Sequence, residues 1–178
     1  MIRILITSDH DVEREAERIG ELLRSDFDIL HLRKPSWNID RCRRLLDEID
    51  SQLYGRIVVH DHYPLCKEYG LRGVHLTGRH PNLPQGMRPK HISCSCHTLQ
   101  EVILRKQEMT YLFLSPIFDS ISKVGYKSPF PYSVLKEAEK NGIIDQQVIA
   151  LGGVDYSKVA LVQEMGFGGY AMLGNIWQ

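Results

Sequence analysis

Eight short apolar runs recur along this chain of 178 residues, and segments of helical period separate most of them. The runs are rich in Ile, Val and Leu without strict polar alternation, which is typical of strands buried on both faces in a parallel sheet. We predict strands at 4–7, 29–32, 57–60, 74–77, 92–95, 112–115, 148–151 and 170–173. Eight such strands alternating with helices favour an α/β fold of the (β/α)₈ TIM barrel type; a doubly wound open sheet is the competing arrangement.

Stripes of apolar residues at helical spacing predict the helices between these strands. Five stripes begin at Val12, Ile39, Leu99, Val134 and Val159, and a shorter one follows Pro64. The second stripe extends to Leu53, and Asn38 stands where its N-cap would be. Gly142 and Gly166 would close the fourth and fifth helices.

Two helices of a complete barrel have no counterpart in the sequence. The segment 78–89 contains two prolines before Pro89 and no helical stripe, so we expect no helix after the fourth strand. The sequence stops at Gln178, directly after the eighth strand, so the eighth helix is expected to be absent or reduced. We therefore predict a trimmed barrel, with a possible homodimer in which a partner subunit covers the gap.

Composition narrows the classes of function. A chain of this length with 43% hydrophobic and 25% charged residues fits a single globular domain over 1–178. With 22 acidic and 22 basic residues, the charge balance does not favour nucleic acid as a partner. The apolar runs are too short to span a bilayer and no signal peptide is recognised, so we expect no membrane association and a cytoplasmic location. Cys94 and Cys96 are expected to be reduced and to face the same side of a strand.

Polar residues gather at the carboxyl ends of the predicted strands, where TIM barrels carry their chemistry. These residues are His31, Arg33, Lys34, His60, Asp61, His62, His75, Arg79, His80, Ser95, His97, Ser120, Ser122, Lys123, Gly152, Gly153, Gly174 and Asn175. Five or six of the eight histidines are thereby expected at one rim. We take His31, Lys34, His60 and Asn175 as candidate substrate-binding residues within this set.

Glycines, hydroxyls and one lysine predict a phosphate site at that rim. The pairs 152–153 and 174–175 follow the seventh and eighth strands, whose loops often bind phosphate through backbone N–H groups. Ser120, Ser122 and Lys123 would add hydrogen-bond donors and positive charge. Taken alone, these segments also fit an ordinary turn and a solvated loop.

With these residues placed, the chain resembles the superfamily of thiamin phosphate synthase and thiazole tautomerase over nearly all of its length. The resemblance is carried by HLRK at 31–34, VHDH at 59–62, GLRGVHLTGRH at 70–80, SCH at 95–97, SPIFDSISK at 115–123, ALGGV at 150–154 and GFGGYAMLGNI at 166–176. It is the order and spacing of seven motifs that makes this resemblance specific.

The resemblance implies that a thiazole phosphate is bound by Gly152, Gly153, Gly174 and their neighbours. In the synthase, further residues hold the diphosphate of hydroxymethylpyrimidine diphosphate, and two aspartates bind Mg²⁺. The residues that match this pattern here are Arg33, Asp61, Ser95, Ser120, Ser122 and Lys123. Asp61 is thus the candidate metal ligand if the chain is a synthase.

Several departures from the synthase pattern favour the tautomerase. His60 replaces an asparagine, His62 replaces an arginine, and Pro35 stands in place of a lysine unless Lys34 substitutes for it. Residues 79–80, Arg-His, occupy the position of the second magnesium aspartate. Because Mg²⁺ prefers oxygen ligands, this exchange weakens a metal site.

The tautomerase moves a proton within a carboxylated thiazole phosphate and needs no metal, and it resembles this chain in His-x-Arg after the second strand. His97 would be the proton shuttle, because histidine titrates near neutrality. Lys123 and Arg33 would hold anionic groups. A capping or packing role is the structural alternative for His97. We rank tautomerisation first, without a cofactor, and the synthase with Mg²⁺ second.

Two other classes of function remain as alternatives. His60 and His62 are two residues apart, so an extended strand end would aim both rings the same way, as in a metallohydrolase. A non-catalytic protein that binds a phosphorylated ligand would keep the phosphate site alone.

Overall fold

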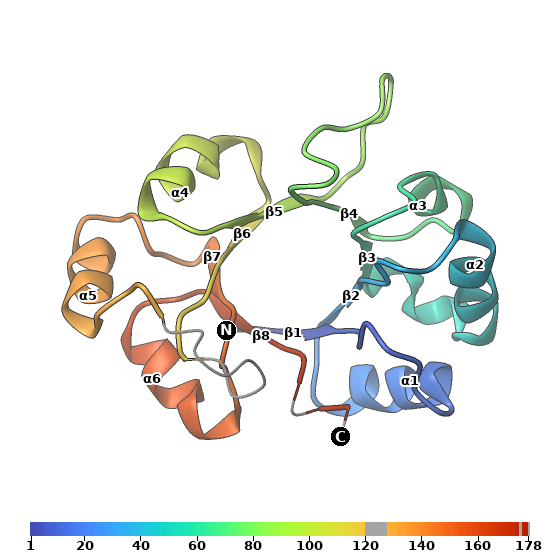
Figure 1. The fold of residues 1–178 in the computed structure, drawn as a ribbon, viewed down its shortest axis with the longest axis horizontal. Coiled ribbons are helices and arrows are strands. Elements are labelled where there is room, and N and C mark those ends of the chain that lie inside the picture. Colours follow the sequence, from blue (N-terminus) through green and yellow to red (C-terminus); the bar gives the residue numbers. More distant parts are fainter. Residues whose placement is uncertain (120–127, 175, 178) are drawn as a thin grey trace.

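The computed structural model describes residues 1–119, 128–174 and 176–177, and in these residues eight parallel strands close into a barrel in sequence order (Figure 1). The strands are β1 (Ile2–Ile6), β2 (Ile29–Leu32), β3 (Ile57–Val59), β4 (Gly73–Leu76), β5 (Ile92–Cys96), β6 (Tyr111–Leu114), β7 (Val148–Ala150) and β8 (Gly169–Met172). The predicted TIM barrel is confirmed, because β1 pairs with β8 and leaves no open edge.

Helices surround the barrel and follow the predicted stripes (Figure 1). They are α1 (Glu15–Ser25), α2 (Ile39–Glu48), α3 (Pro64–Glu68), α4 (Leu99–Arg105), α5 (Tyr132–Lys140) and α6 (Val159–Glu164), with 3₁₀ turns η1 (Ser51–Arg56), η2 (Lys106–Glu108) and η3 (Tyr156–Lys158). None of these helices is long and apolar enough to cross a membrane.

The helix ends show how local sequence sets the elements. Asn38 caps α2 by accepting a hydrogen bond from the backbone N–H of Arg41 at 2.9 Å, as predicted. The second stripe does not form one helix to Leu53, because the chain is extended at Ile49 and Asp50 then caps η1. Leu53 nevertheless stays buried, since η1 returns it to the same apolar layer.

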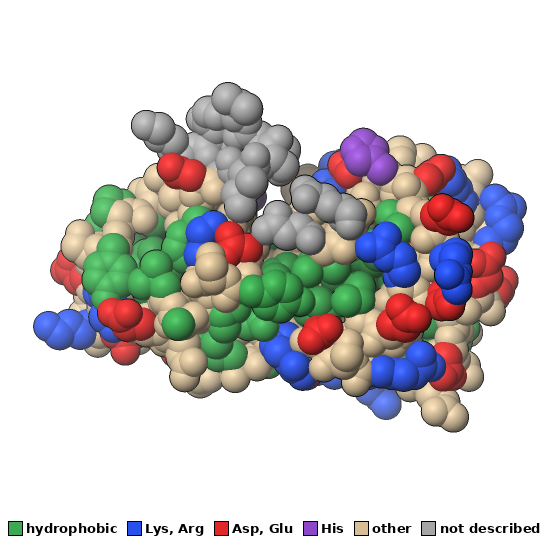
Figure 2. Space-filling model, turned by 90° about the horizontal axis from the view of Figure 1, so that it is seen from below, with side chains coloured by type: hydrophobic (Ala, Val, Ile, Leu, Met, Phe, Trp, Pro, Cys, Tyr) green, Lys and Arg blue, Asp and Glu red, His purple; other side chains and the backbone are tan. Residues whose placement is uncertain are grey.

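The described residues contain no helix between β4 and β5 and none after β8, the two places where the sequence predicted none. Residues 77–91 form a long loop between β4 and β5 (Figure 1). Hydrophobic side chains gather on the side of the molecule seen from below in Figure 2, between α6 and α1 in the view of Figure 1. That a partner subunit covers this side stays a prediction.

Two hydrophobic clusters lie on opposite sides of the strands. The larger one packs between the barrel and its helices. The smaller one fills the barrel interior and consists of Ile4, Ile6, Ile29, Val58, Tyr111, Phe113, Ile149 and Ala171. Because side chains alternate across a strand, residues two positions from these also face the interior, and this alternation decides where the polar residues point.

Gly73 offers a test of how tightly β4 and β5 approach. A Cβ atom at Gly73 would lie 2.1 Å from the backbone oxygen of His91, so a side chain forces the backbone apart. We expect Gly73→Ala to lower the free energy of unfolding by about 2 kcal/mol or more in urea denaturation. Gly55→Ala is the matched control, because nothing lies within 4 Å of a Cβ there. Equal stability of the two variants would contradict the close approach.

Candidate active site

Three histidines occupy the barrel interior below its mouth. His31, His60 and His75 are all buried, and Nδ1 of His31 lies 2.8 Å from Nε2 of His60. His75 contacts two serine hydroxyls of β5, with its Nδ1 2.9 Å from Ser93 Oγ and its Nε2 2.9 Å from Ser95 Oγ. The expected ring of histidines at the rim is therefore corrected for these three: strand alternation turns them into the barrel.

Burial keeps these imidazoles neutral. It lowers the pKa of His31 and His60 well below the usual value, and repulsion between two protonated imidazoles at such short range opposes charging in the same direction. Burial also lowers the pKa of His75 to about 3 and that of His91, the residue before β5, to about 4. His31 and His60 cannot serve as charged phosphate ligands, because they are uncharged and hydrogen-bonded to neighbours inside the barrel.

The interior histidines do not form a metal centre. One nitrogen from each of His31, His60 and His75 lies within 4.8 Å of the others. However, the rings of His60 and His75 stack at 4.2 Å with an interplanar angle of 19°, so their in-plane lone pairs do not converge on one point. The predicted pairing of His60 with His62 was wrong: His62 has a φ of 53° and its Nε2 lies 2.8 Å from the backbone oxygen of Trp37.

Arg33 places positive charge above the histidines. It follows β2, and its backbone N–H and C=O both bond to the hydroxyl of Thr7 at 2.9 Å, which ties the segment to the end of β1. Arg33 lies two residues beyond the interior-facing His31, so side-chain alternation places it on the same side of the strand and nearer the mouth, and its charge contributes to the lowered pKa of His60 and His75. Among the described residues, no carboxylate pairs with Arg33.

Asp61 pairs with Arg79, and the synthase pattern would place its second magnesium-binding aspartate at the position of Arg79 and His80. Its Oδ1 lies 3.0 Å from Arg79 and 3.4 Å from Nε2 of His80, and its Oδ2 is buried without a partner among the described residues. Mg²⁺ requires several oxygen ligands, and here the carboxylate is already neutralised by a guanidinium. The donor set around Asp61 therefore does not fit the metal that the synthase pattern implies.

Ser95 and His97 stand at the carboxyl end of β5. Ser95 is half-buried, and its hydroxyl meets His75, whereas His97 is exposed. Nδ1 of His97 lies 3.0 Å from the backbone oxygen of Ser115. Because a carbonyl only accepts, Nδ1 carries the proton and Nε2 of the neutral ring can accept another. Thr98, and not His97, caps α4 with a hydrogen bond from the N–H of Glu101.

The glycines after β7 and β8 offer backbone N–H groups. Gly152 and Gly153 have φ angles of 91° and 65°, and a Cβ at Gly152 would lie 2.7 Å from Cα of Pro116. Glycine is thus required by the close approach of the loop after β6. Within the described residues, neither N–H donates to a protein acceptor, and nothing lies within 4 Å of a Cβ at Gly174.

Lys34 points away from the barrel mouth. Its ammonium pairs with the buried Glu15 of α1 at 2.7 Å and donates to the backbone oxygen of His10 at 3.1 Å. It lies 4.3 Å from the centre of the Trp37 ring. Lys34 was predicted to bind substrate phosphate, and this placement gives it a structural role instead, because the residue after Arg33 alternates to the helix side of β2.

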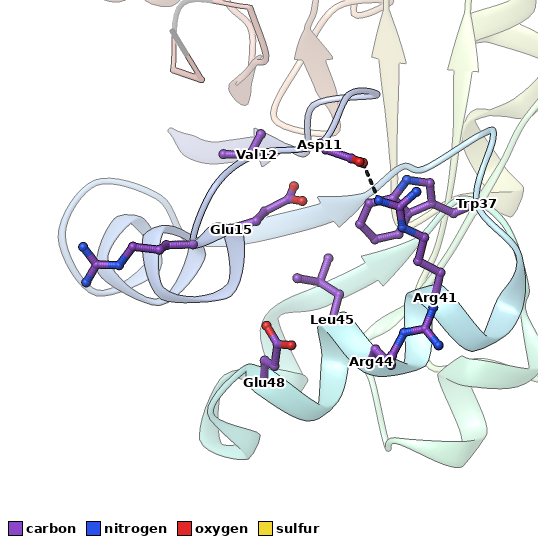
Figure 3. A pocket seen from close by; sticks show the side chains of 9 residues that line it. Asp11, Val12, Glu15, Trp37, Arg41, Arg44, Leu45 and Glu48 are labelled. Atoms are coloured by element: carbon purple, nitrogen blue, oxygen red, sulfur yellow. Dashed lines mark ion pairs between the residues drawn. The ribbon is translucent and has the colours of Figure 1, made fainter.

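A groove of about 300 Å³ lies beside this ion pair, between α1 and α2 on the outer side of the barrel (Figure 3). Glu15 and Trp37 point into it, and Arg41 pairs with Asp11 across one end at 2.6 Å. The groove mixes acidic and basic side chains and does not include the residues at the ends of the strands.

Four predicted site residues, Ser120, Ser122, Lys123 and Asn175, lie outside the described residues. Asp119 and Ser128, the described residues on either side of 120–127, are hydrogen-bonded: the carboxylate of Asp119 accepts from the backbone N–H of Ser128 at 2.7 Å.

Sequence reasoning missed Ser93 and Tyr111, whose hydroxyls bond to the interior histidines. The signal was available: His91, Ser93 and Ser95 repeat every second residue on one face of a strand.

Comparisons with known proteins point to one family. A family model described as thiamine monophosphate synthase matches residues 3–176. Over 99% of this chain and 85% of the other, the chain is 38% identical to a structure titled thiamine phosphate pyrophosphorylase from Bacteroides thetaiotaomicron, with a TM-score of 0.91. A thiamine phosphate pyrophosphorylase from Pyrococcus furiosus shares the fold at 18% identity, with a TM-score of 0.77 over 97% of this chain and 85% of that one.

A thiamine-phosphate synthase of Chlamydia caviae is 26% identical over 137 residues. The match covers 74% of this chain, and it spans 62% of the length of that relative.

The buried histidines make stability depend on pH. An unfolded histidine has a pKa near 6.5, and folding lowers the pKa of His75 to about 3. Stability is therefore complete above pH 6.5 and falls as the pH drops towards the folded values, by about 1.4 kcal/mol per pH unit for each proton taken up. We expect the urea midpoint to fall steeply between pH 6.5 and 4.5, and His75→Gln to make the fall shallower by about one proton. The exposed His10, changed to Gln, should leave the slope unaltered, and an equally steep fall in both variants would contradict this assignment.

Replacing the arginine of the Asp61–Arg79 pair by a carboxylate should create a metal site. Arg79→Asp places a second carboxylate beside Asp61, so we expect roughly tenfold tighter Mg²⁺ binding than in the unmodified protein, measured by isothermal titration calorimetry. Arg44→Asp makes the same change of charge at an exposed position of α2 and should not tighten Mg²⁺ binding. If Mg²⁺ binds the unmodified protein as tightly as it binds the Arg79→Asp variant, the donor set does fit the metal.

Proposed function

The chain belongs to the thiamine monophosphate synthase family, and from this premise we propose that it joins hydroxymethylpyrimidine diphosphate to thiazole phosphate and releases diphosphate. The main support for this proposal is the match to the family model over residues 3–176. The barrel mouth also holds cationic groups and backbone N–H groups that are suited to binding anions. The tautomerase reaction, ranked first from sequence, has less support from the comparisons than the synthase.

The coupling reaction needs stabilisation of a departing diphosphate. As the bond between the pyrimidine methylene carbon and the diphosphate oxygen breaks, negative charge grows on the leaving group, and preorganised donors lower the barrier. Arg33 is half-buried at the mouth without a carboxylate partner among the described residues, and the hydroxyl of Ser95 lies at the end of β5. We assign both to the diphosphate.

The second substrate requires a separate anion site. The N–H groups of Gly152 and Gly153 are suited to the phosphate of the thiazole, because positive φ angles let a ligand approach the backbone closely. The exposed Gly174 completes this edge of the mouth. Substrate phosphate and diphosphate would thus bind on opposite parts of the rim, at the ends of β7–β8 and β2–β5.

No step of this proposal uses a metal ion bound by the protein. The carboxylate of Asp61 faces Arg79 at 3.0 Å, so the guanidinium supplies the positive charge at this position. Arg79 is half exposed, and it also donates to the backbone oxygen of Pro35 at 3.3 Å, which holds it beside the segment that carries Arg33.

One observation favours tautomerisation of carboxythiazole phosphate as a second candidate. His97 is exposed, and its Nδ1 contacts the backbone oxygen of Ser115, which leaves Nε2 available for proton transfer; a proton shuttle requires such a group and the coupling step does not.

A single set of assays tests both candidates. We expect the purified protein to release diphosphate from the two substrates, and Ser95→Ala to lower kcat/KM roughly 10- to 100-fold through loss of one donor to the leaving group. Ser51→Ala, at an exposed position of η1, is the matched control. His97→Ala should change the coupling rate less than about threefold, because coupling assigns it no proton transfer.

Other outcomes of these assays assign the protein differently. Isomerisation of carboxythiazole phosphate without diphosphate release, lost in His97→Ala, would replace the synthase by the tautomerase. Binding of thiazole phosphate with neither reaction would identify a non-catalytic binder.

A further inference from the structure

Lys158, the last residue of η3, holds the loop after β7 through its side chain. Its ammonium donates to the backbone oxygen of Gly153 at 2.6 Å and to Oδ2 of Asp155 at 2.8 Å. Asp155 is itself fixed, because its Oδ1 accepts a hydrogen bond from the backbone N–H of Ser157 at 2.9 Å and so caps η3. Only 27% of the Lys158 side chain is exposed, so the ammonium makes ordered contacts and is not simply solvated.

Both carbonyl groups of the glycine pair are engaged. The backbone oxygen of Gly152 accepts from the N–H of Phe118 at 3.0 Å, and that of Gly153 accepts from Lys158. The peptide bonds of this loop are trans, and the C=O and N–H of a trans peptide unit point in opposite directions. Each hydrogen bond to a carbonyl therefore also sets the direction of the N–H in the same peptide unit. The two N–H groups fixed in this way belong to Gly153 and Val154.

The two carbonyls are held from one side. The Lys158 ammonium lies 5.3 Å from the centre of the Phe118 ring, so it is close to the residue that holds the Gly152 carbonyl. The N–H groups of Gly153 and Val154 consequently share the opposite side. Neither donates to an acceptor among the described residues, although Val154 is buried. A backbone N–H at a buried position normally has a partner, which indicates that this pair of donors serves a bound acceptor.

We propose that Lys158 is a positioning residue that holds the Gly153 carbonyl and thereby presents the N–H of Val154, beside that of Gly153, to a phosphate group. The inference rests on the proposed function in taking the loop after β7 as the phosphate site. The ligand class is a phosphate monoester, whose oxygens accept hydrogen bonds from neighbouring N–H groups. In this role Lys158 does not contact the phosphate itself. It acts through the peptide group between Gly153 and Val154, which it keeps in the binding orientation before the ligand arrives.

Charge alone is the other way in which a lysine could favour phosphate. Here Asp155 pairs with the ammonium, and hydrogen bonds from Lys158 and Ser157 lower the pKa of Asp155, so the carboxylate stays ionised and offsets the charge. Salt separates the two effects. In about 0.5 M NaCl the attraction between charges that do not touch is largely screened, whereas the orientation of a peptide group is not.

Amide spectra of the ¹⁵N-labelled protein test the proposal locally, with inorganic phosphate as the probe. In the unmodified protein we expect phosphate to shift the amide signals of Gly153 and Val154. We expect Lys158→Met to bind phosphate roughly tenfold more weakly than the unmodified protein, both at low salt and in about 0.5 M NaCl. Unshifted amides in the unmodified protein, or a difference between the two proteins that disappears at high salt, would overturn the proposal.

Lys106 provides the matched control, because it makes the same kinds of contact at the opposite end of β7. Its ammonium donates to the backbone oxygens of Gly142 and Ile143 at 2.9 and 3.0 Å and pairs with Asp145 at 2.7 Å. Lys106→Met removes a comparable set of contacts from the loop that precedes β7 and should leave phosphate affinity within about twofold. Equal weakening in the two variants would trace the effect to a general loss of stability and rule out a positioning role.

Steady-state kinetics of the coupling reaction provide a second readout. We expect Lys158→Met to raise KM for thiazole phosphate roughly tenfold, with kcat and KM for hydroxymethylpyrimidine diphosphate within about twofold. A similar rise in both KM values would contradict a role confined to the phosphate loop. If the unmodified protein does not couple the two substrates, the proposed function is rejected, whereas the amide shifts and the comparison with Lys106→Met still decide the role of Lys158.

Discussion

The alternation of side chains along eight closed parallel strands is the constraint on which the rest of this structure depends. In a barrel this small, every second residue of each strand must fit into one shared interior. Ile149 and Phe113 belong to the apolar cluster that fills it, and the rings of His31 and His75 pack against Phe113 at tilted angles. Imidazoles are tolerated there because they are neutral and because each hydrogen bond between them removes the cost of burying a polar group.

The same alternation assigns neighbouring residues to different tasks. His31 faces the interior, Arg33 emerges one layer higher at the mouth, and Lys34 turns to the helices, where it pairs with Glu15. A buried lysine–glutamate pair is costly to desolvate, and burial raises the pKa of Glu15 while Lys34 opposes that rise. The pair joins α1 to the segment after β2, and so holds in place the loop that presents Arg33.

The sequence allowed the barrel and its trimmed helices to be predicted, because apolar runs, caps such as Asn38 and the prolines of the β4–β5 loop act locally. It did not allow the direction of single side chains to be predicted at strand ends. Whether His60 lies in the rim or beneath it depends on one residue of register, and the partner of Asp61 is an arginine 18 residues away. The positive φ of His62 likewise depends on tertiary contacts, since its ring reaches the Trp37 carbonyl.

A wholly apolar interior would be the more stable solution, since buried polar networks gain little over well-packed hydrophobic side chains. A polar interior is useful only if its hydrogen bonds reach a functional surface, and here they do. The hydrogen bonds of His75 reach Ser95, at the same mouth as Arg33 and the glycines after β7. The buried imidazole of His75 therefore links the packing of the core to a hydroxyl at the mouth, where a phosphorylated ligand would bind.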